Sequence, residues 1–89
     1  MNSILENPKQ ALIQYVSFPS VSADSNYSEG IVGARDFACA LLAELGFEIN
    51  LVETPINPVI LATRGDPSWP RLVIYGHYDV QPPDPLDLW

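Results

Sequence analysis

Two residues near the end of the chain, His77 and Asp79, have side chains suited to metal chemistry. His77 is the single histidine, and neutral imidazole is a common ligand of Zn²⁺, with bonds of roughly 2.0–2.1 Å. Asp79 lies two positions further on, so in an extended backbone both side chains point to the same side. A carboxylate there can accept the hydrogen of the other ring nitrogen, which fixes the tautomer and raises the basicity of the ligand. Taken as three residues alone, the pattern is short, and a hydrogen-bonded structural histidine is the simpler interpretation.

Other forms of catalysis that use His77 have less support in the sequence. A Ser-His-Asp arrangement could include Ser20 or Ser22, but neither serine lies in the strand-turn-helix sequence that exposes a nucleophile. A Cys-His pair would need Cys39, which the apolar pattern places within a helix. The sequence also lacks a glycine-rich phosphate-binding loop.

Two helices are expected before this pair. The first is predicted at 8–17, capped by Asn7, because proline suits the first helical position and a second proline follows the segment. The second is predicted to start at Ser28 as its N-cap and to stop at Gly46. Residues 19–26 are polar and rich in turn formers, which predicts a loop between the helices. The apolar positions of the second helix recur every three or four residues and comprise Ile31, Ala34, Ala38, Leu41 and Leu45, widened by Phe37 and Leu42.

The periodicity then changes from helical to that of strands. Residues 47–53 alternate apolar and polar side chains, as in a half-buried strand, and 59–63 form a short apolar run typical of a covered strand. The run 72–75 is apolar and β-prone throughout, which predicts an inner strand buried on both faces. The order helix, helix, strand, strand, strand predicts an α/β fold. Ligands of such sheets bind beyond the carboxyl ends of the strands, where His77 and Asp79 lie.

The composition limits the classes of partner. The chain has 89 residues and a net charge of −7, from 11 acidic and 4 basic side chains, and this disfavours nucleic acid because phosphate binding needs a basic surface. The single cysteine, Cys39, rules out an internal disulfide and agrees with a reducing cytosol. No run approaches the roughly 20 apolar residues of a membrane span, and residues 1–6 lack a signal-peptide pattern. We therefore expect a cytoplasmic protein with neither nucleic-acid nor membrane partners.

The longer sequence around the pair, residues 72–89, closely resembles a signature of a zinc-dependent metallopeptidase family. That family includes carnosinase-type dipeptidases, aminoacylase, glutamate carboxypeptidase and succinyl-diaminopimelate desuccinylase. Residues 19–22 are similar to the loop after the family's first helix, 45–47 to the end of its second helix, and 52–54 to the strand that follows. The resemblance implies that residues 1–89 are an N-terminal fragment of an α/β, mixed-sheet catalytic domain. It also implies that the sheet is incomplete and the family's inserted dimerisation domain is absent.

The resemblance implies a role for each residue of the pair. His77 would be a ligand of one of two Zn²⁺ ions, with Co²⁺ or Mn²⁺ as possible substitutes, and Asp79 would orient His77. In that family a metal-bound water, its pKa lowered toward about 7, attacks a dipeptide or an N-acyl amino acid. The bridging aspartate, the general-base glutamate and the other ligands of the family lie beyond residue 89, whereas a catalytic zinc needs about three protein ligands. We therefore expect the chain alone to be inactive and to hold no metal tightly.

Two alternatives remain open. A non-catalytic α/β module could form a homo-oligomer through the edge of its incomplete sheet, because unpaired strand edges recruit other strands. A weak surface metal site could combine His77 with neighbouring carboxylates. Asp84 and Asp87 lie in a proline-rich tail, where surface solvation is their expected role.

Overall fold

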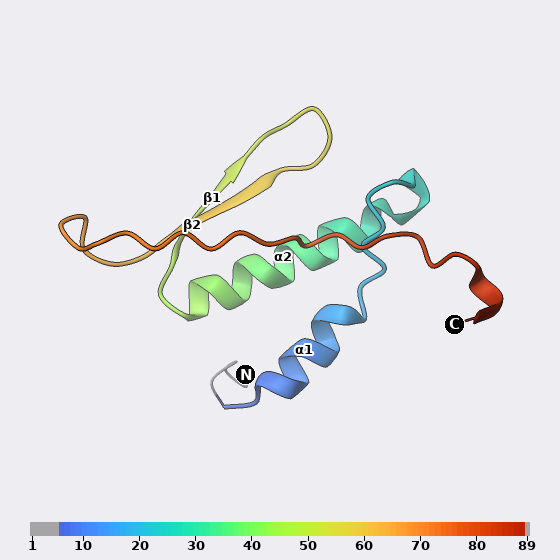
Figure 1. Cartoon of the computed structure of the whole chain (residues 1–89), viewed down its shortest axis with the longest axis horizontal. Coiled ribbons are helices and arrows are strands. Elements are labelled where there is room, and N and C mark those ends of the chain that lie inside the picture. The colour runs from blue at the N-terminus through green and yellow to red at the C-terminus, as the bar shows by residue number, and fades with distance from the viewer. Residues whose placement is uncertain (1–5, 89) are drawn as a thin grey trace.

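The computed structural model describes residues 6–88, in which two α-helices and one antiparallel pair of strands are formed. The stretch 1–5, which holds most of the residues compared with a signal peptide, and Trp89 lie outside the described part. Figure 1 shows α2 as the longest element, with α1 below it and the hairpin of β1 and β2 above it. The elements are α1 (Pro8–Val16), a 3₁₀ turn (Ser25–Tyr27), α2 (Ser28–Glu44), β1 (Glu48–Val52), β2 (Val59–Thr63) and a second 3₁₀ turn (Leu86–Leu88).

The ends of α1 agree with the sequence prediction. The side chain of Asn7 accepts a hydrogen bond of 3.1 Å from the backbone N–H of Gln10, and Pro8 occupies the first helical position. Ser17 forms the C-cap. The cap and the proline therefore define this short helix before any packing is considered.

Aromatic rings join α1 to α2. The ring of Tyr15 stacks on that of Phe37 with centroids 5.9 Å apart, and Phe18, just after α1, lies 5.8 Å from Phe37 in a tilted arrangement. Aromatic pairs in these geometries contribute about 0.5–1.5 kcal/mol beyond the burial of their surface. Leu12 and Val16, which are also apolar residues of α1, are more than half exposed. The apolar side chains of α1 are therefore covered only in part.

The start of α2 differs from the prediction, whereas its end agrees with it. Ser28 is the first helical residue and not the N-cap, which is Tyr27 without a side-chain capping bond. The preceding 3₁₀ turn explains the difference, because it leaves Ser28 with helical angles of φ −59° and ψ −36°. At the other end Gly46 has a φ of 89°, and the N–H of Phe47 donates to the carbonyl of Leu42 at 3.0 Å. These features form a Schellman ending, for which glycine is suited.

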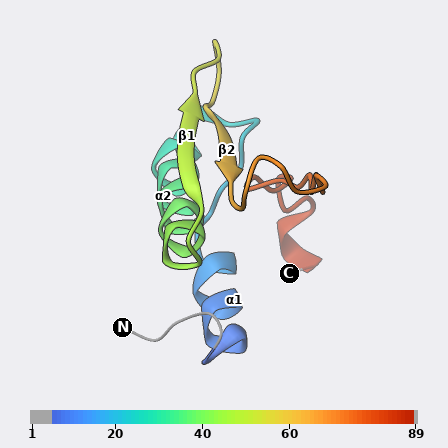
Figure 2. The ribbon, with the colours of Figure 1, turned by 90° about the vertical axis from the view of Figure 1, so that its left-hand side faces the viewer.

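β1 and β2 form the two predicted strands as a hairpin. Their register pairs Glu48 with Thr63 at one end and Val52 with Val59 at the other. Figure 2 shows α2 alongside the hairpin, and both strands contact the helix. The hairpin and the two helices confirm the expected mixture of helix and strand, which is consistent with the α/β class.

The prediction of an inner strand at 72–75 is wrong for this structure. The run is unpaired, and its side chains are 80–86% exposed. In Figure 2 the segment after β2 extends to the side of the hairpin that faces away from α2. A strand that is apolar on both faces needs neighbouring strands and covering helices. The sheet formed within residues 6–88 contains only β1 and β2, so nothing there supplies them.

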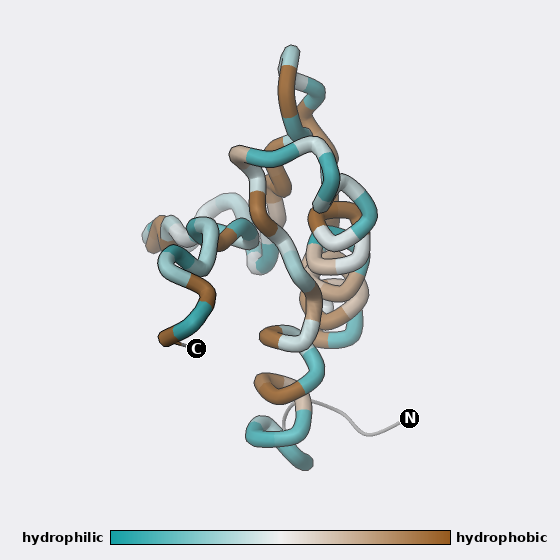
Figure 3. Tube along the Cα trace, turned by 90° about the vertical axis from the view of Figure 1, so that its right-hand side faces the viewer, coloured by the Kyte–Doolittle hydropathy of each residue, from teal (hydrophilic) through white to brown (hydrophobic). Residues whose placement is uncertain are grey.

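The buried core is small. Among residues 6–88 the buried apolar side chains are those of Val21, Ile31 and Ala34. The radius of gyration is 14.9 Å, larger than the roughly 12 Å typical of a compact domain of this length. Figure 3 shows hydrophobic positions spread over the helices and the C-terminal segment, without a single centre. The three buried residues place this small core where the loop after α1 meets α2. None of the helices in the described part has the length and apolar character needed to cross a membrane.

Candidate metal centre

The structure brings His77 and Asp79 together. Nδ1 of His77 lies 3.2 Å from Oδ1 of Asp79, and the two side chains are 67% and 37% exposed. The imidazole is therefore largely open to solvent and is not enclosed in an apolar cluster. Because the carboxylate engages Nδ1, Nε2 is the ring nitrogen left to bind a metal.

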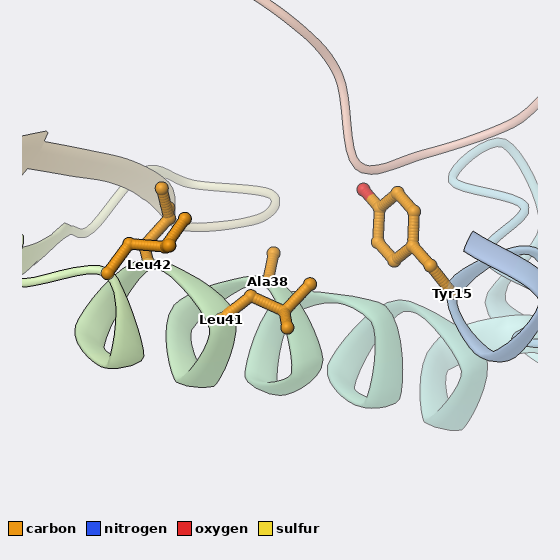
Figure 4. Close-up of a pocket in the computed structure, with 5 residues that line it drawn as sticks. Tyr15, Ala38, Leu41 and Leu42 are labelled. Atoms are coloured by element: carbon orange, nitrogen blue, oxygen red, sulfur yellow. The ribbon is translucent and has the colours of Figure 1, made fainter. Parts of the chain in front are cut away.

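Two tyrosines contact His77. The ring of Tyr75 meets the imidazole edge to face, with centroids 5.3 Å apart, and its hydroxyl lies 3.5 Å from Nε2. The hydroxyl of Tyr15 donates to the backbone carbonyl of His77 at 3.4 Å, and Figure 4 shows this hydroxyl directed toward the passing segment. Both distances are long for hydrogen bonds, so the contacts are weak. Burial, together with the charge of Asp79, raises the pKa of Tyr15.

Ser22 is part of this site, although the sequence analysis considered it only as a nucleophile. Its hydroxyl donates to Oδ2 of Asp79 at 2.6 Å. This hydrogen bond is the main cause of a lowered pKa of Asp79; partial burial opposes it, and the contact with His77 adds to it. Asp79 is therefore a carboxylate at neutral pH, with each oxygen engaged by a different side chain.

The arrangement does not suit nucleophilic catalysis by serine or cysteine. In a Ser-His-Asp triad the imidazole lies between hydroxyl and carboxylate, whereas here the carboxylate of Asp79 lies between Ser22 and His77. Ser20 is buried, with 4% of its surface exposed. Cys39 is half-buried within α2, and burial, aided by the charge of a neighbouring aspartate, raises the pKa of its thiol. A raised thiol pKa opposes the thiolate that such catalysis needs.

Backbone contacts hold the loop after α1 against the segment that carries the pair. The N–H of Val80 donates to the carbonyl of Ser20 at 2.9 Å, and Val21 and Val80 form an isolated parallel bridge. The same segment also contacts the hairpin, because the hydroxyl of Tyr78 donates to the carbonyl of Pro58, just before β2, at 2.5 Å. The His77–Val80 stretch therefore contacts both the loop after α1 and the hairpin.

The residues present fit one part of a metal site. A largely exposed imidazole with a carboxylate on Nδ1 matches the usual surroundings of a histidine ligand. Within residues 6–88, however, no three His, Cys, Asp or Glu side chains lie close enough together to hold an ion, so Asp84 and Asp87 do not complete the set. Three protein ligands are usual for a catalytic zinc. The described residues thus offer one candidate ligand, His77, in contact with one carboxylate, Asp79.

Two hollows on the surface of the described residues differ in chemistry. One of about 160 Å³ lies between the end of α1 and residues 77–80, next to the His77–Asp79 pair. The other, of about 270 Å³, is almost wholly apolar and is lined by Tyr15 of α1 and by side chains around the C-terminal half of α2 (Figure 4). Only the first brings ionisable side chains together, so it is the candidate for chemistry.

Curated proteins with similar sequences are named as metallodipeptidases and as a desuccinylase. The Cys-Gly metallodipeptidase dug1 of Schizosaccharomyces pombe is 34% identical over 89 residues, which cover 88% of this chain and 19% of that protein. The Cys-Gly metallodipeptidase DUG1 of Saccharomyces cerevisiae is 33% identical over 92 residues, covering 88% and 19%. The succinyl-diaminopimelate desuccinylase of Leptothrix cholodnii is 33% identical over 75 residues, covering 79% and 18%. These relatives support the metallopeptidase family that the sequence resembles.

The names of these relatives confirm the resemblance found in the sequence. The chain spans about a fifth of the length of the curated relatives it matches. No family model matches the chain, and no solved structure does. The roles of His77 as metal ligand and of Asp79 as its partner stay predictions. The structure shows that the two side chains are in contact.

Proposed function

We propose that the chain supplies one metal ligand, His77, and its orienting carboxylate, Asp79, to a metal-dependent peptidase or amidohydrolase. The observation that carries the proposal is the 3.2 Å contact between Nδ1 of His77 and Asp79, which leaves Nε2 for a metal, in a relative of metallodipeptidases. Zinc is the proposed metal, with cobalt or manganese as substitutes. A bound divalent ion supplies Lewis-acid activation of water and of the substrate carbonyl.

The side chains of this chain prepare the ligand. Asp79 accepts the Nδ1 hydrogen and so places the lone pair of the imidazole on Nε2. Ser22 holds the other oxygen of Asp79, and the ring of Tyr75 contacts the imidazole edge to face. Each contact acts on the orientation of His77 and not on the substrate directly.

The proposed substrate is a dipeptide or an N-acyl amino acid. Two relatives are named as Cys-Gly dipeptidases and one as a desuccinylase of succinyl-diaminopimelate. Both kinds of name support hydrolysis of a small substrate. On this proposal the pair at 77 and 79 acts on the metal, so it does not select between the two kinds of substrate.

We also propose that residues 1–89 are an N-terminal part of a catalytic domain whose other ligands and general base come from further sequence. Two observations support this. The chain spans about a fifth of its relatives, and the described residues contain no group of three metal-binding side chains. On this proposal the chain alone is inactive. A cytoplasmic location is proposed as well, since Cys39 is free.

The test compares the full-length protein that carries this chain with the 89-residue chain alone. Each is incubated with Zn²⁺, Co²⁺ or Mn²⁺ and assayed on Cys-Gly and on succinyl-diaminopimelate. We expect the full-length protein to hydrolyse at least one of them, to lose activity on chelation and to regain it with metal. A full-length protein without activity on either substrate overturns the proposed function. Chelator-sensitive activity of the isolated chain overturns the incomplete site.

A second candidate function is self-association without catalysis. It is favoured by one observation, the exposure of the unpaired apolar run 72–75. Such a segment can add as a strand to an equivalent segment of a second copy, because its backbone groups have no partners in the sheet. Its test is the oligomeric state described below.

A further inference from the structure

We propose that Ser22 is a positioning residue, which sets the orientation of Asp79 and, through it, of the His77 ring. The inference rests on the proposed function, since it gives Ser22 a purpose only if His77 binds a metal. Ser22 lies on the loop after α1, far in sequence from the pair it contacts.

The two carboxylate oxygens of Asp79 contact different side chains. Oδ2 accepts from the hydroxyl of Ser22 at 2.6 Å, and Oδ1 faces Nδ1 of His77 at 3.2 Å. A bond between a hydroxyl and a carboxylate at this length is charge-assisted and strong. Because Oδ2 is held, rotation of the carboxylate is restricted and Oδ1 stays directed at the imidazole. Without the hydroxyl, the partly exposed Asp79 could turn toward water.

The backbone just before Ser22 is buried and paired. The two residues before it, Ser20 and Val21, are 4% and 3% exposed, and both are joined to Val80 through the backbone bond and the parallel bridge. Ser22 is therefore carried by a buried, paired stretch, although its own side chain is exposed. Its hydroxyl is in a fixed place relative to Asp79.

The loop that carries Ser22 also lies against α2. A Cβ at Gly30 would lie 2.0 Å from the carbonyl oxygen of Pro19, so the loop backbone lies directly on the helix at this point. Only glycine permits such an approach. The longest helix of the fold thus supports the loop, the loop carries Ser22, and Ser22 holds Asp79 against His77.

The decisive measurement is the tautomer of His77 in the metal-free, full-length protein, read by long-range ¹⁵N–¹H NMR in alkaline buffer, where imidazole is neutral. In the unmodified protein we expect mainly the tautomer with hydrogen on Nδ1, because Asp79 accepts it. Ser22→Ala is expected at least to double the share of the Nε2–H tautomer. Ser22→Thr keeps the hydroxyl and is expected to restore the original ratio. The exposed Ser25, changed to Ala, serves as the matched control.

The second measurement is metal affinity, by competition with a fluorescent zinc chelator. Carboxylates behind histidine ligands contribute 10–100-fold to metal affinity, so loss of the hydroxyl that holds one is expected to weaken binding about tenfold. Ser22→Thr should remain within about threefold of the unmodified protein. Equal tautomer ratios and affinities in Ser22→Ala and Ser25→Ala would overturn the positioning role while leaving the metal function intact. A full-length protein that neither binds metal nor hydrolyses either substrate overturns the proposed function, and the metal role of Ser22 with it.

Discussion

The hydroxyl of Ser22 and the carboxylate of Asp79 are joined by a 2.6 Å hydrogen bond across 57 positions of sequence. The bond connects the loop after α1 with the segment after the apolar run at 72–75. It makes the candidate site a product of tertiary contacts and not of the local His-x-Asp pattern alone.

Replacing Asp79 by Asn should lower both metal affinity and hydrolysis in the full-length protein about 10–100-fold. The amide removes the negative charge that holds the Nδ1 hydrogen of His77. Asp84→Asn is a matched control, since Asp84 is exposed and lies in the tail. Chelator competition and steady-state kinetics measure the effects. Equal losses in the two variants would show that Asp79 has no special relation to the metal.

The pKa of Asp79 should be found below the ordinary value of 3.8, and Ser22→Ala should raise it toward that value. The hydrogen bond from Ser22 is the largest cause of the lowered pKa and stabilises the charged form. A carboxyl with a lowered folded pKa contributes stability above its unfolded pKa, and this is lost as pH falls through the folded value. Carboxyl ¹³C NMR of metal-free protein under acid titration tests this. An unchanged midpoint in the variant contradicts it.

Gly30→Ala should lower the free energy of unfolding by about 2 kcal/mol, within the usual range for overpacking. The new Cβ would meet a backbone carbonyl at 2.0 Å, which outweighs the helix propensity of alanine, a gain of about 1 kcal/mol. Gly33→Ala should cost less, because its Cβ would meet the Phe18 ring, which can turn. Gly76, with no atom within 4 Å of a Cβ, is the control. Urea unfolding followed by circular dichroism ranks the variants; a Gly30→Ala protein as stable as Gly76→Ala contradicts the close contact.

Titration of zinc into the 89-residue chain should show no submicromolar binding. The described residues provide one imidazole and one nearby carboxylate, short of the three ligands that a tight site needs. Isothermal calorimetry measures the affinity. Submicromolar binding that disappears in His77→Ala would mean that this chain completes a site by itself.

The isolated chain should self-associate in a concentration-dependent manner, and Ile74→Lys should reduce this. Ile74 is 86% exposed in the unpaired apolar run, and a lysine there opposes strand addition. Ile56→Lys is a matched control, since Ile56 is 83% exposed but lies in the β1–β2 loop. Light scattering after gel filtration gives the mass. A compact monomer at high concentration, or equal effects of both lysines, counts against pairing through 72–75.

The elements that depend on local signals could be predicted from the sequence. Asn7 with Pro8 starts α1, and Gly46 ends α2, because caps and left-handed glycines act within a few residues. The strands β1 and β2 also followed from the alternation and apolar runs. Ser28 was misassigned because a 3₁₀ turn, which has no comparable sequence signal, precedes the helix.

The features that depend on distant residues could not be predicted in this way. The run at 72–75 has the composition of an inner strand, but pairing needs neighbours, and residues 6–88 place none beside it. The spacing of His77 and Asp79 predicted their contact, because it is local. The part played by Ser22 was missed, since a hydroxyl in a polar loop carries no indication of which carboxylate it will meet. The one signal for Ser22 was the similarity of residues 19–22 to the loop after the first helix of the metallopeptidase family.

Tyr78, which lies between His77 and Asp79, has a hydrogen-bond partner of its own. Tyr78 donates its hydroxyl to the carbonyl of Pro58, while the side chains on either side of it contact each other. Adding or deleting one residue here would therefore do more than alter a spacing. It would break the contact of Tyr78 with the hairpin or the contact between His77 and Asp79. The length of this stretch is therefore constrained by two contacts. We expect substitutions in it to be better tolerated than insertions or deletions.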